Sequence, residues 1–114
     1  MAHTYYLSGP MKGYPESNFP LFERATAALR AQGYLIVSPH EKGSETPDAN
    51  YYDLLRADGR LIMDCHGIIL LPGWPTSKGA CWELNIALGL GLEVWFYAQD
   101  ARGLVKMSAV APLE

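Results

Sequence analysis

The chain has 114 residues, of which 49% are hydrophobic and 18% are charged, and its formal net charge is −3. This length suits a modest core, so we expect residues 1–114 to form a single domain without a second lobe. The slightly acidic charge, with no cluster of basic residues, argues against binding of nucleic acid. No apolar run approaches the roughly 20 residues that would span a membrane, so no membrane partner is expected.

The two cysteines and the amino-terminal residues bear on the cellular compartment of the protein. Cys65 and Cys81 do not form the closely spaced pair of a metal site, and we interpret both as reduced thiols. Met1–Thr4 leads directly into a predicted strand and lacks the layout of a signal peptide. The sequence therefore favours a cytoplasmic location, and it offers no ligand set for a metal.

Predicted strands and helices alternate along the chain. Short apolar runs have the length of buried strands, and longer segments space their apolar side chains as helices do. In chain order the elements are a strand over Thr4–Ser8, a helix from Ser17 or Asn18 to about Gln32, a strand over Tyr34–Ser38, a helix over Tyr51–Cys65, a strand over Gly67–Leu71, a helix from Ser77 to about Leu90 and a strand over Leu92–Tyr97. His40–Ala49 is polar and predicted as a loop, while Leu104–Val110 fits either a short helix or an edge strand.

Continuous apolar strands separated by helices are typical of a parallel sheet that is covered on both faces. We therefore predict an α/β fold, namely a single-domain flavodoxin- or Rossmann-like three-layer sandwich with a mostly parallel sheet of four or five strands. Ligands of such folds bind at the carboxyl ends of the strands, where the strand order reverses. With the strand order 2-1-3-4, the loops Ser8–Gly13 and Pro72–Gly79 face each other across one crevice.

The turn after the third strand is the most informative stretch. A Pro- and Gly-rich turn leads into a helix that begins with Ser77, Lys78 and Gly79. Unpaired N–H groups at a helix N-terminus bind anions, so this corner is a candidate phosphate site. Ser77 equally suits a helix cap, in which its hydroxyl only holds a backbone N–H group. Gly79 favours the anion site, because it lets a ligand come close.

Glu83 lies one or two turns into the same helix. Its neighbours include Cys81, Trp82 and Leu84, which are not typical of a solvated helix face. On such a face the carboxylate would gain only about 0.3–1 kcal/mol from the helix dipole. A lone carboxylate among apolar residues is more often functional, so Glu83 is a candidate catalytic residue.

A second glycine-bearing turn, Gly9–Gly13, follows the first strand. It matches neither the dinucleotide-binding pattern nor the Walker A pattern. Its backbone is placed to approach a sugar or a phosphate, and Lys12 would add positive charge. The alternative is a tight connection in which glycine serves only the backbone geometry.

Three further residues have both a structural and a functional interpretation. Asp58 lies near Arg56 and Arg60 on the second helix, so it is either a site residue or part of a surface salt bridge. His66 stands at a helix–strand junction and is either a capping residue or a site residue. Trp74 is either a platform for a stacked base or a lid over the core.

These residues together resemble the nucleoside 2-deoxyribosyltransferase-like superfamily, and most closely its small DUF4406-type branch, whose members are often phage or prophage proteins. The resemblance spans roughly residues 4–97. The positions that carry it are Tyr6–Met11, Asn18, Phe22, Leu29, Asp58, Leu70–Trp74, Ser77–Ala80, Glu83 and Ala87.

The resemblance implies catalytic roles for several of these residues. In the superfamily a carboxylate on the helix after the third strand is the nucleophile, and Glu83 matches it. An aspartate on the preceding helix handles protons at the base, and Asp58 matches it. A tyrosine on the first strand, here Tyr6, orients the nucleophile or the sugar. In the nucleoside 5′-monophosphate hydrolases a serine six positions before the nucleophile binds phosphate, and Ser77 stands there.

The chain departs from the family at two positions. The branch often carries a second aspartate where this chain has His66, or Asp64 in a shifted register, so His66 is expected beside the site. Pro10 stands where some hydrolases carry a phosphate-binding serine, and Ser8 or Lys12 is expected to replace that contact. The predicted substrate-binding residues are Ser8, Gly9, Pro10, Met11, Lys12, Gly13, His66, Trp74, Ser77 and Gly79.

The resemblance thus predicts cleavage of the N-glycosidic bond of a nucleoside or deoxynucleoside 5′-monophosphate, or of a nucleoside. One alternative is a nucleoside 2-deoxyribosyltransferase that exchanges bases. A second alternative is a nucleotide-binding module without turnover. The expected ligand is a small-molecule nucleotide or nucleoside, no cofactor is expected, and the family implies a homodimer or a larger homo-oligomer.

Overall fold

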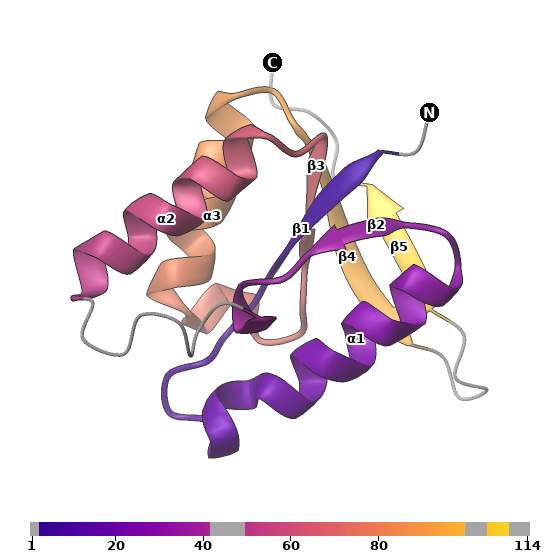
Figure 1. Cartoon of the computed structure of the whole chain (residues 1–114), viewed down its shortest axis with the longest axis horizontal. Coiled ribbons are helices and arrows are strands. Elements are labelled where there is room, and N and C mark those ends of the chain that lie inside the picture. The colour runs from indigo at the N-terminus through magenta and orange to yellow at the C-terminus, as the bar shows by residue number, and fades with distance from the viewer. Residues whose placement is uncertain (1–2, 42–49, 100–104, 110–114) are drawn as a thin grey trace.

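The structure, a computed structural model, describes residues 3–41, 50–99 and 105–109. Helices and strands alternate within these residues, as predicted (Figure 1). The strands are β1 (Thr4–Ser8), β2 (Leu35–Val37), β3 (Gly67–Leu70), β4 (Glu93–Gln99) and β5 (Val105–Ala109). The helices are α1 (Phe19–Ala31), α2 (Tyr51–Met63) and α3 (Lys78–Gly89), with the short 3-10 helices η1 (Pro15–Asn18), η2 (Pro39–Glu41) and η3 (Trp74–Thr76).

The described strands form one sheet in the order β2-β1-β3-β4-β5. β1 pairs in parallel with β2 and β3, and β3 pairs in parallel with β4. The predicted order of these four strands is therefore confirmed. β5 runs antiparallel to β4 at the edge of the sheet. Of the two interpretations of the tail segment, the edge strand is the correct one, over Val105–Ala109.

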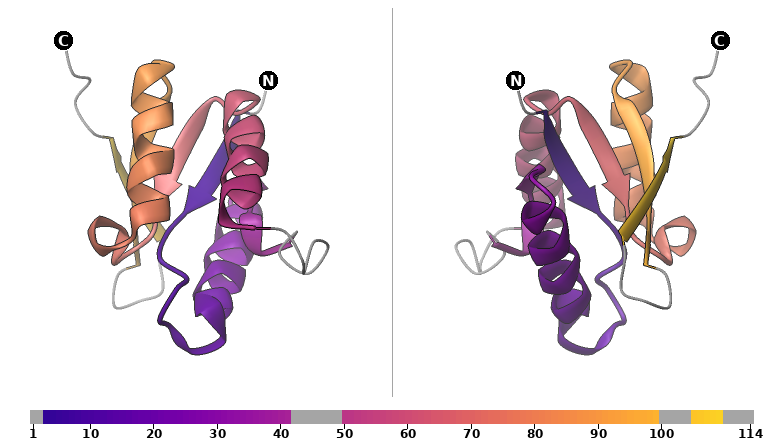
Figure 2. Two further views of the ribbon diagram at one scale, coloured as in Figure 1. Left: turned by 90° about the vertical axis from the view of Figure 1, so that its left-hand side faces the viewer. Right: turned by 90° about the vertical axis from the view of Figure 1, so that its right-hand side faces the viewer.

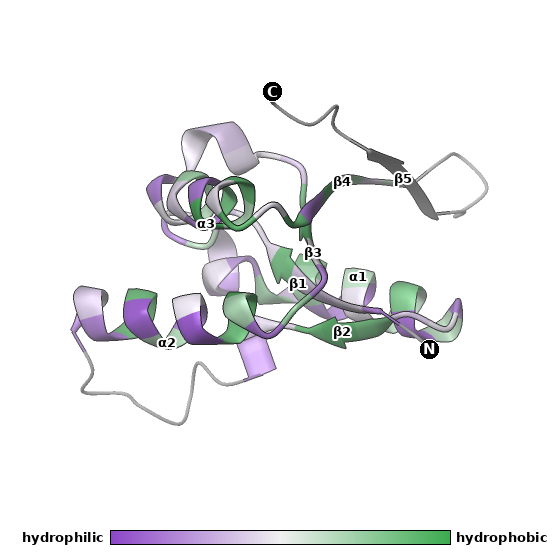
Figure 3. Ribbon diagram, turned by 90° about the horizontal axis from the view of Figure 1, so that it is seen from above, coloured by the Kyte–Doolittle hydropathy of each residue, from purple (hydrophilic) through white to green (hydrophobic). Residues whose placement is uncertain are grey.

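Helices cover both faces of the sheet (Figure 1 and Figure 2). On the face covered by α1, the buried core residues are Tyr5, Leu7, Phe22, Ala25, Leu29, Ile36, Ile69, Leu71 and Tyr97. On the face covered by α2 and α3, they are Tyr6, Ile62, Cys65, Ile68, Leu70, Ala87 and Val94. Figure 3 shows β2 as hydrophobic, whereas α2 alternates between hydrophobic and hydrophilic residues. The predicted three-layer α/β sandwich is confirmed.

Side-chain alternation along β1 decides which of its residues face α2 and α3. Tyr5 and Leu7 belong to the core beneath α1, whereas Tyr6 belongs to the core beneath α2 and α3. Ser8 follows Tyr6 by two positions, so it lies on the same face of the strand. The strand therefore presents two hydroxyl groups to the helices that carry Asp58 and Glu83.

The sequence predicts a helix that begins at Ser17 or Asn18, whereas α1 begins at Phe19 and has no side-chain cap. Glu16, Ser17 and Asn18 have left-handed backbone conformations, with φ of 53°, 55° and 62°. The Asn18 side chain does not cap the helix; its Nδ2 donates to the backbone oxygen of Pro10 at 2.8 Å. Asn18 therefore ties the start of the helix to the loop after β1.

The loops after β1 and β3 lie against each other, as predicted for neighbouring parallel strands. Gly73 has a φ of 89°, a conformation that glycine adopts readily. A Cβ at Gly73 would lie 2.8 Å from Tyr14 Oη and 3.1 Å from Pro10 Cγ. The close contact between these loops therefore requires glycine at this position.

Parts of two predictions lie outside the described residues. These are most of the loop predicted over His40–Ala49 and the ends of the tail segment Leu104–Val110. None of the helices within the described ranges has the length and hydrophobicity that crossing a lipid bilayer requires.

Candidate active site

Glu83 lies on the face of α3 that packs against the sheet. The buried residues of this helix are Ala80, Glu83 and Ala87, which share one face because they are three and four positions apart. Glu83 is only 6% exposed. The interpretation of Glu83 as a charge on a solvated helix face is therefore wrong.

Two hydroxyl groups of β1 hold the Glu83 carboxylate. Tyr6 Oη donates to Glu83 Oε2 at 2.6 Å, and Ser8 Oγ donates to Glu83 Oε1 at 2.6 Å. Both donors are fully buried. Because each carboxylate oxygen accepts from a different hydroxyl, the orientation of the carboxylate is fixed from both sides.

Asp58 reaches the same cluster from α2. It is half-buried, and its charge acts on both Tyr6 and Glu83. Arg56, an expected partner in the salt-bridge interpretation, instead donates to Asp53 Oδ1 at 3.0 Å. The structure therefore places Asp58 with Glu83 and Tyr6, as the resemblance implies.

Burial and the neighbouring groups shift the pKa values of Glu83, Asp58 and Tyr6. Burial raises the pKa of Glu83 to about 8, and the charge of Asp58 adds to the rise, although the hydrogen bonds from Ser8 and Tyr6 oppose it. Burial also raises the pKa of Asp58. Burial, followed by the charges of Glu83 and Asp58, raises the pKa of Tyr6 well above its usual value, so Tyr6 keeps its proton as a donor. Two acids with raised pKa values retain a proton between them near neutral pH, which suits general acid catalysis.

The loop after β1 exposes fewer groups than the sequence suggested. Pro10 is buried, and Met11 packs against the core beneath α1. A Cβ at Gly9 would lie 2.8 Å from Cβ of Leu71, so close packing accounts for this glycine. The exposed residues of the loop are Lys12 and Gly13, and contact of any of these loop residues with substrate stays a prediction.

The start of α3 combines a cap with open space. Ser77 Oγ accepts from the backbone N–H of Ala80 at 3.1 Å, so the capping interpretation of Ser77 is confirmed. Within the described residues, and apart from the backbone of α3 and the adjacent residues, a Cβ at Gly79 would have one neighbour within 4 Å, Ser77 Oγ at 3.9 Å. The described residues therefore leave space beside Gly79, while anion binding at this corner stays a prediction.

Trp74 packs on the sheet after β3. Its ring stacks on Phe96, with ring centroids 6.0 Å apart and planes inclined by 24°. It is partly buried against the core beneath α2 and α3. This packing favours the interpretation of Trp74 as a lid over the core.

His66 is not brought to the cluster around Glu83, which corrects the expectation that it lies beside the site. Its Nδ1 accepts from the backbone N–H of Thr4 at 3.0 Å, and its ring stacks on His3 with centroids 4.4 Å apart. Thr4 is the first residue of β1, whereas Ser8, which contacts Glu83, is the last. His66 therefore caps the amino end of β1, at the opposite edge of the sheet.

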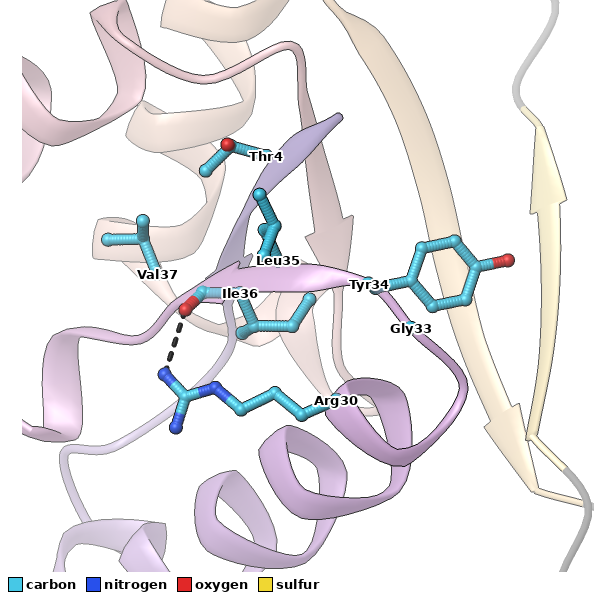
Figure 4. A pocket seen from close by; sticks show the side chains of 7 residues that line it. All are labelled: Thr4, Arg30, Gly33, Tyr34, Leu35, Ile36 and Val37. Carbon is cyan, nitrogen blue, oxygen red and sulfur yellow. Dashed lines mark hydrogen bonds between the residues drawn. The ribbon is translucent and has the colours of Figure 1, made fainter. Parts of the chain in front are cut away.

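A hollow of about 510 Å³ lies along the edge strand β2 (Figure 4). Its lining residues are Thr4, Arg30, Gly33, Tyr34, Leu35, Ile36 and Val37. Arg30 Nη2 donates to the backbone oxygen of Ile36 at 2.9 Å, and Arg30 also forms an ion pair with Glu41 at 2.8 Å. No predicted site residue lines this hollow, so it is separate from the candidate active site.

The remaining thiols and acids of the described residues do not form a second chemical site. No group of three or more His, Cys, Asp or Glu side chains is placed there to hold a metal ion. Cys65 and Cys81 are free thiols. Burial raises the pKa of Cys65 to about 11, so its thiol stays protonated at neutral pH.

Ser8 is the one residue of the Glu83 cluster whose contact the sequence reasoning missed. It had been grouped with the substrate-binding loop, as a possible replacement for a phosphate contact. The signal that would have found it is the period of two along a strand, which places Ser8 on the same face as Tyr6.

Comparisons with known proteins agree with this fold. A 2-desoxiribosyltransferase from Leishmania mexicana superposes with a TM-score of 0.65 at 18% identity, over 91% of this chain and 78% of that chain. A 2-deoxyribosyltransferase from Bacillus psychrosaccharolyticus superposes with a TM-score of 0.64 at 21% identity, over 82% of this chain and 70% of that chain. At these identities the similarity establishes a shared fold.

Comparison at the sequence level gives the family. No curated protein matches the chain. Residues 3–96 match the family described as a domain of unknown function, DUF4406. These residues include the whole Glu83 cluster and strands β1–β3. The resemblance stated from the sequence is therefore confirmed, and the chain belongs to the DUF4406 family, whose fold here is that of the 2-deoxyribosyltransferases.

Proposed function

We propose that this protein cleaves the N-glycosidic bond of a nucleoside 5′-monophosphate or a nucleoside, with Glu83 as the nucleophile. The observation that carries the proposal is the buried Glu83 carboxylate, held by Tyr6 and Ser8 beside a second acid, Asp58. Retaining glycosidases use two carboxyl groups, one as the nucleophile and one as the general acid and base. Ser8 ends β1, so the cluster lies at the strand ends where ligands of such folds bind.

The proposed first step forms a glycosyl ester. With the proton of the acid pair on Asp58, a carboxylate oxygen of Glu83 attacks C1′ of the sugar, the bond from C1′ to the base nitrogen breaks, and its electron pair stays on the base. Asp58 donates a proton to that base. In the second step water attacks C1′, the ester bond breaks to regenerate the Glu83 carboxylate, and Asp58 accepts the proton of the water.

For the 5′ end of the substrate we propose the corner at the start of α3. A helix N-terminus favours negative charge, and space is open beside Gly79. Ser77 holds the first turn in place through its bond to Ala80 N–H. The exposed Lys12 of the loop after β1 would add positive charge. A phosphate at this corner is thus favoured by dipole and charge together.

A second candidate function is transfer of the sugar to another base. The two similar structures are named 2-deoxyribosyltransferases, and this favours it. Both functions share the glycosyl ester on Glu83 and differ in what attacks it. Adding a second free base to the reaction separates them, because a transferase forms a new nucleoside whereas a hydrolase forms free sugar.

The direct test is a panel of ribo- and deoxyribonucleosides and their 5′-monophosphates, followed by chromatography for free base. We expect release by the wild-type protein and a loss of at least about a hundredfold in Glu83→Gln. Glu93→Gln is the matched control. Glu93 also accepts from a tyrosine, Tyr5 Oη at 3.3 Å, but it begins β4 at the amino edge of the sheet. Its activity should stay near that of the wild type.

Two results would count against this assignment. Equal base release by wild type and Glu83→Gln would show that Glu83 is not the nucleophile. Ligand-induced thermal stabilisation without any product would favour a binding module without turnover. The expected homodimer or larger assembly also stays a prediction, which sedimentation equilibrium tests directly.

A further inference from the structure

We propose that Ser8 is a positioning residue, which holds the Glu83 carboxylate for attack and does not contact the substrate. The inference rests on the proposed function, because it takes Glu83 as the nucleophile. It changes the role of Ser8 from a phosphate contact to part of the support of the nucleophile.

The backbone holds Ser8 firmly. Ser8 pairs with Leu70 in the parallel β1–β3 ladder, and its carbonyl oxygen accepts from Leu71 N at 2.8 Å. The residue has no exposed surface. Its Oγ lies 2.6 Å from Glu83 Oε1. A hydroxyl has one proton to donate, and here that proton goes to Glu83.

The contact from Ser8 is complementary to the contact from Tyr6. Tyr6 Oη donates a hydrogen bond to Glu83 Oε2, and Ser8 Oγ donates one to Glu83 Oε1. One donor fixes the position of one oxygen and leaves the carboxylate free to pivot about that contact. A donor on each oxygen fixes the positions of both oxygens. Fixing a nucleophile in this way is how a folded site lowers the entropic cost of attack.

A direct phosphate contact conflicts with this arrangement. The Ser8 hydroxyl would have to leave Glu83 to donate to a phosphate oxygen, and a buried carboxylate oxygen would lose its donor. Leaving a buried polar group without its partner is costly. The open space beside Gly79 offers an anion a place that disturbs no such bond.

The same contact bears on the charge state of Glu83. Hydrogen bonds from Ser8 and Tyr6 favour the charged form and so lower the pKa of Glu83, against burial and the charge of Asp58. Removal of the Ser8 hydroxyl should therefore raise that pKa. Asp58 on α2 and Tyr6 on β1 are the other titratable groups that act on Glu83.

The first test needs no substrate. The protein is labelled with ¹³C at the glutamate side-chain carboxyl carbon, and Glu83 is assigned by its absence in Glu83→Gln. In Ser8→Ala we expect the titration midpoint of Glu83 to rise by about one pH unit. The matched control is Ser38→Ala, since Ser38 is also buried but its hydroxyl is bonded to His40. An unchanged midpoint in Ser8→Ala, or an equal rise in Ser38→Ala, overturns the inference.

Ser8→Cys serves as a second variant if Ser8→Ala does not fold, because the thiol keeps the shape of the side chain and is a weaker donor. In kinetics, loss of a positioning contact lowers kcat by about tenfold or more with KM little changed, and moves the acid limb of the pH profile upward. A raised KM with unchanged kcat would instead identify Ser8 as a substrate contact. Failure of the proposed function shows separately, as undiminished base release by Glu83→Gln.

Discussion

Tyr6 and Glu83 are 77 positions apart in the chain, yet the Tyr6 hydroxyl donates to Glu83 Oε2 at 2.6 Å. Parallel pairing of β1 with β3, which places Tyr6 opposite Ile68, allows α3 to pack over β1. Both residues are buried, so water does not compete for this hydrogen bond. A hydrogen bond is stronger in such surroundings than in water, so this contact helps to hold α3 against β1 and to fix the proposed nucleophile.

Tyr6→Phe should reduce both activity and stability. The substitution keeps the ring in the core and removes only the donor to Glu83. We expect kcat/KM for base release to fall about a hundredfold, because the nucleophile loses one of its two supports. We expect the free energy of unfolding to fall by about 1–3 kcal/mol, because a buried acceptor loses its partner. Steady-state kinetics and urea unfolding measure the two effects.

Tyr5→Phe is the matched control for this change. Tyr5 is the adjacent residue, but it lies on the other face of β1 and donates to Glu93 Oε1 at 3.3 Å. Its removal should leave base release near the wild-type level. Equal losses of activity in the two variants would mean that the hydroxyl of Tyr6 has no special role.

The raised pKa of Glu83 predicts that stability falls as pH rises. An unfolded chain releases the Glu83 proton near the usual pKa of 4.5, whereas burial raises the pKa to about 8 in the folded protein. Between these values the folded state holds a proton that the unfolded state has lost, so the free energy of unfolding decreases with pH. The stability that this bound proton contributes is present in full below the pKa of Glu83 in the unfolded chain. It is lost as the pH rises through the pKa of Glu83 in the folded protein. Burial also raises the pKa of Asp58, so Asp58 adds to the decrease of the free energy of unfolding with pH.

Urea unfolding at a series of pH values from about 5 to about 8.5 measures this slope. Glu83→Gln removes the titrating group and should flatten most of it. Glu93→Gln should retain the wild-type slope, since Glu93 is outside the Glu83 cluster. A wild-type slope that persists unchanged in Glu83→Gln would show that other groups cause it.

Most of the fold could be predicted because its parallel strands are short, largely apolar runs between helices. Thr4–Ser8 and Gly67–Leu71 were recognised as buried strands, and the structure has them over Thr4–Ser8 and Gly67–Leu70. Continuous apolar strands between helices leave few arrangements other than a covered parallel sheet. The start of α1 was harder, because no local pattern predicts that Asn18 adopts a left-handed conformation and donates to Pro10 in the loop after β1.

The sequence predicted the site residues whose chemical surroundings are unusual. It did not predict the residues whose contacts depend on how the chain packs. Glu83 stood out as a carboxylate among apolar residues, whereas Ser8 looked like part of a polar loop until its partner was known. His66 was placed by family position, but its bond to Thr4 puts it at the other edge of the sheet. Gly9 has two interpretations in the sequence, a ligand contact or part of a tight connection, and the closeness of Leu71 supplies a packing reason for the glycine.

Gly9→Ala should destabilise the protein. Its new methyl group would lie 2.8 Å from Cβ of Leu71, in a loop whose neighbour Ser8 is held by backbone and side chain. Crowding of this kind costs about 1–3 kcal/mol. Gly89→Ala is the matched control, because a Cβ there would meet no other described residue within 4 Å apart from its chain neighbours and the backbone of its own helix. Urea unfolding should show a loss for the first variant only, and equal stabilities would contradict the packing explanation of Gly9.

Gly79→Ala separates the two interpretations of the corner at the start of α3, namely a phosphate site or a helix cap alone. Alanine is a better helix former than glycine, so stability should stay unchanged or rise by up to about 1 kcal/mol. The methyl group would fill the space beside Ser77, so a phosphate held there should bind roughly tenfold more weakly. Calorimetric titration in the Glu83→Gln background, with a nucleoside 5′-monophosphate and the same nucleoside, measures both affinities without turnover. A larger loss for the monophosphate supports the phosphate site, whereas equal losses would leave Ser77 as a helix cap alone.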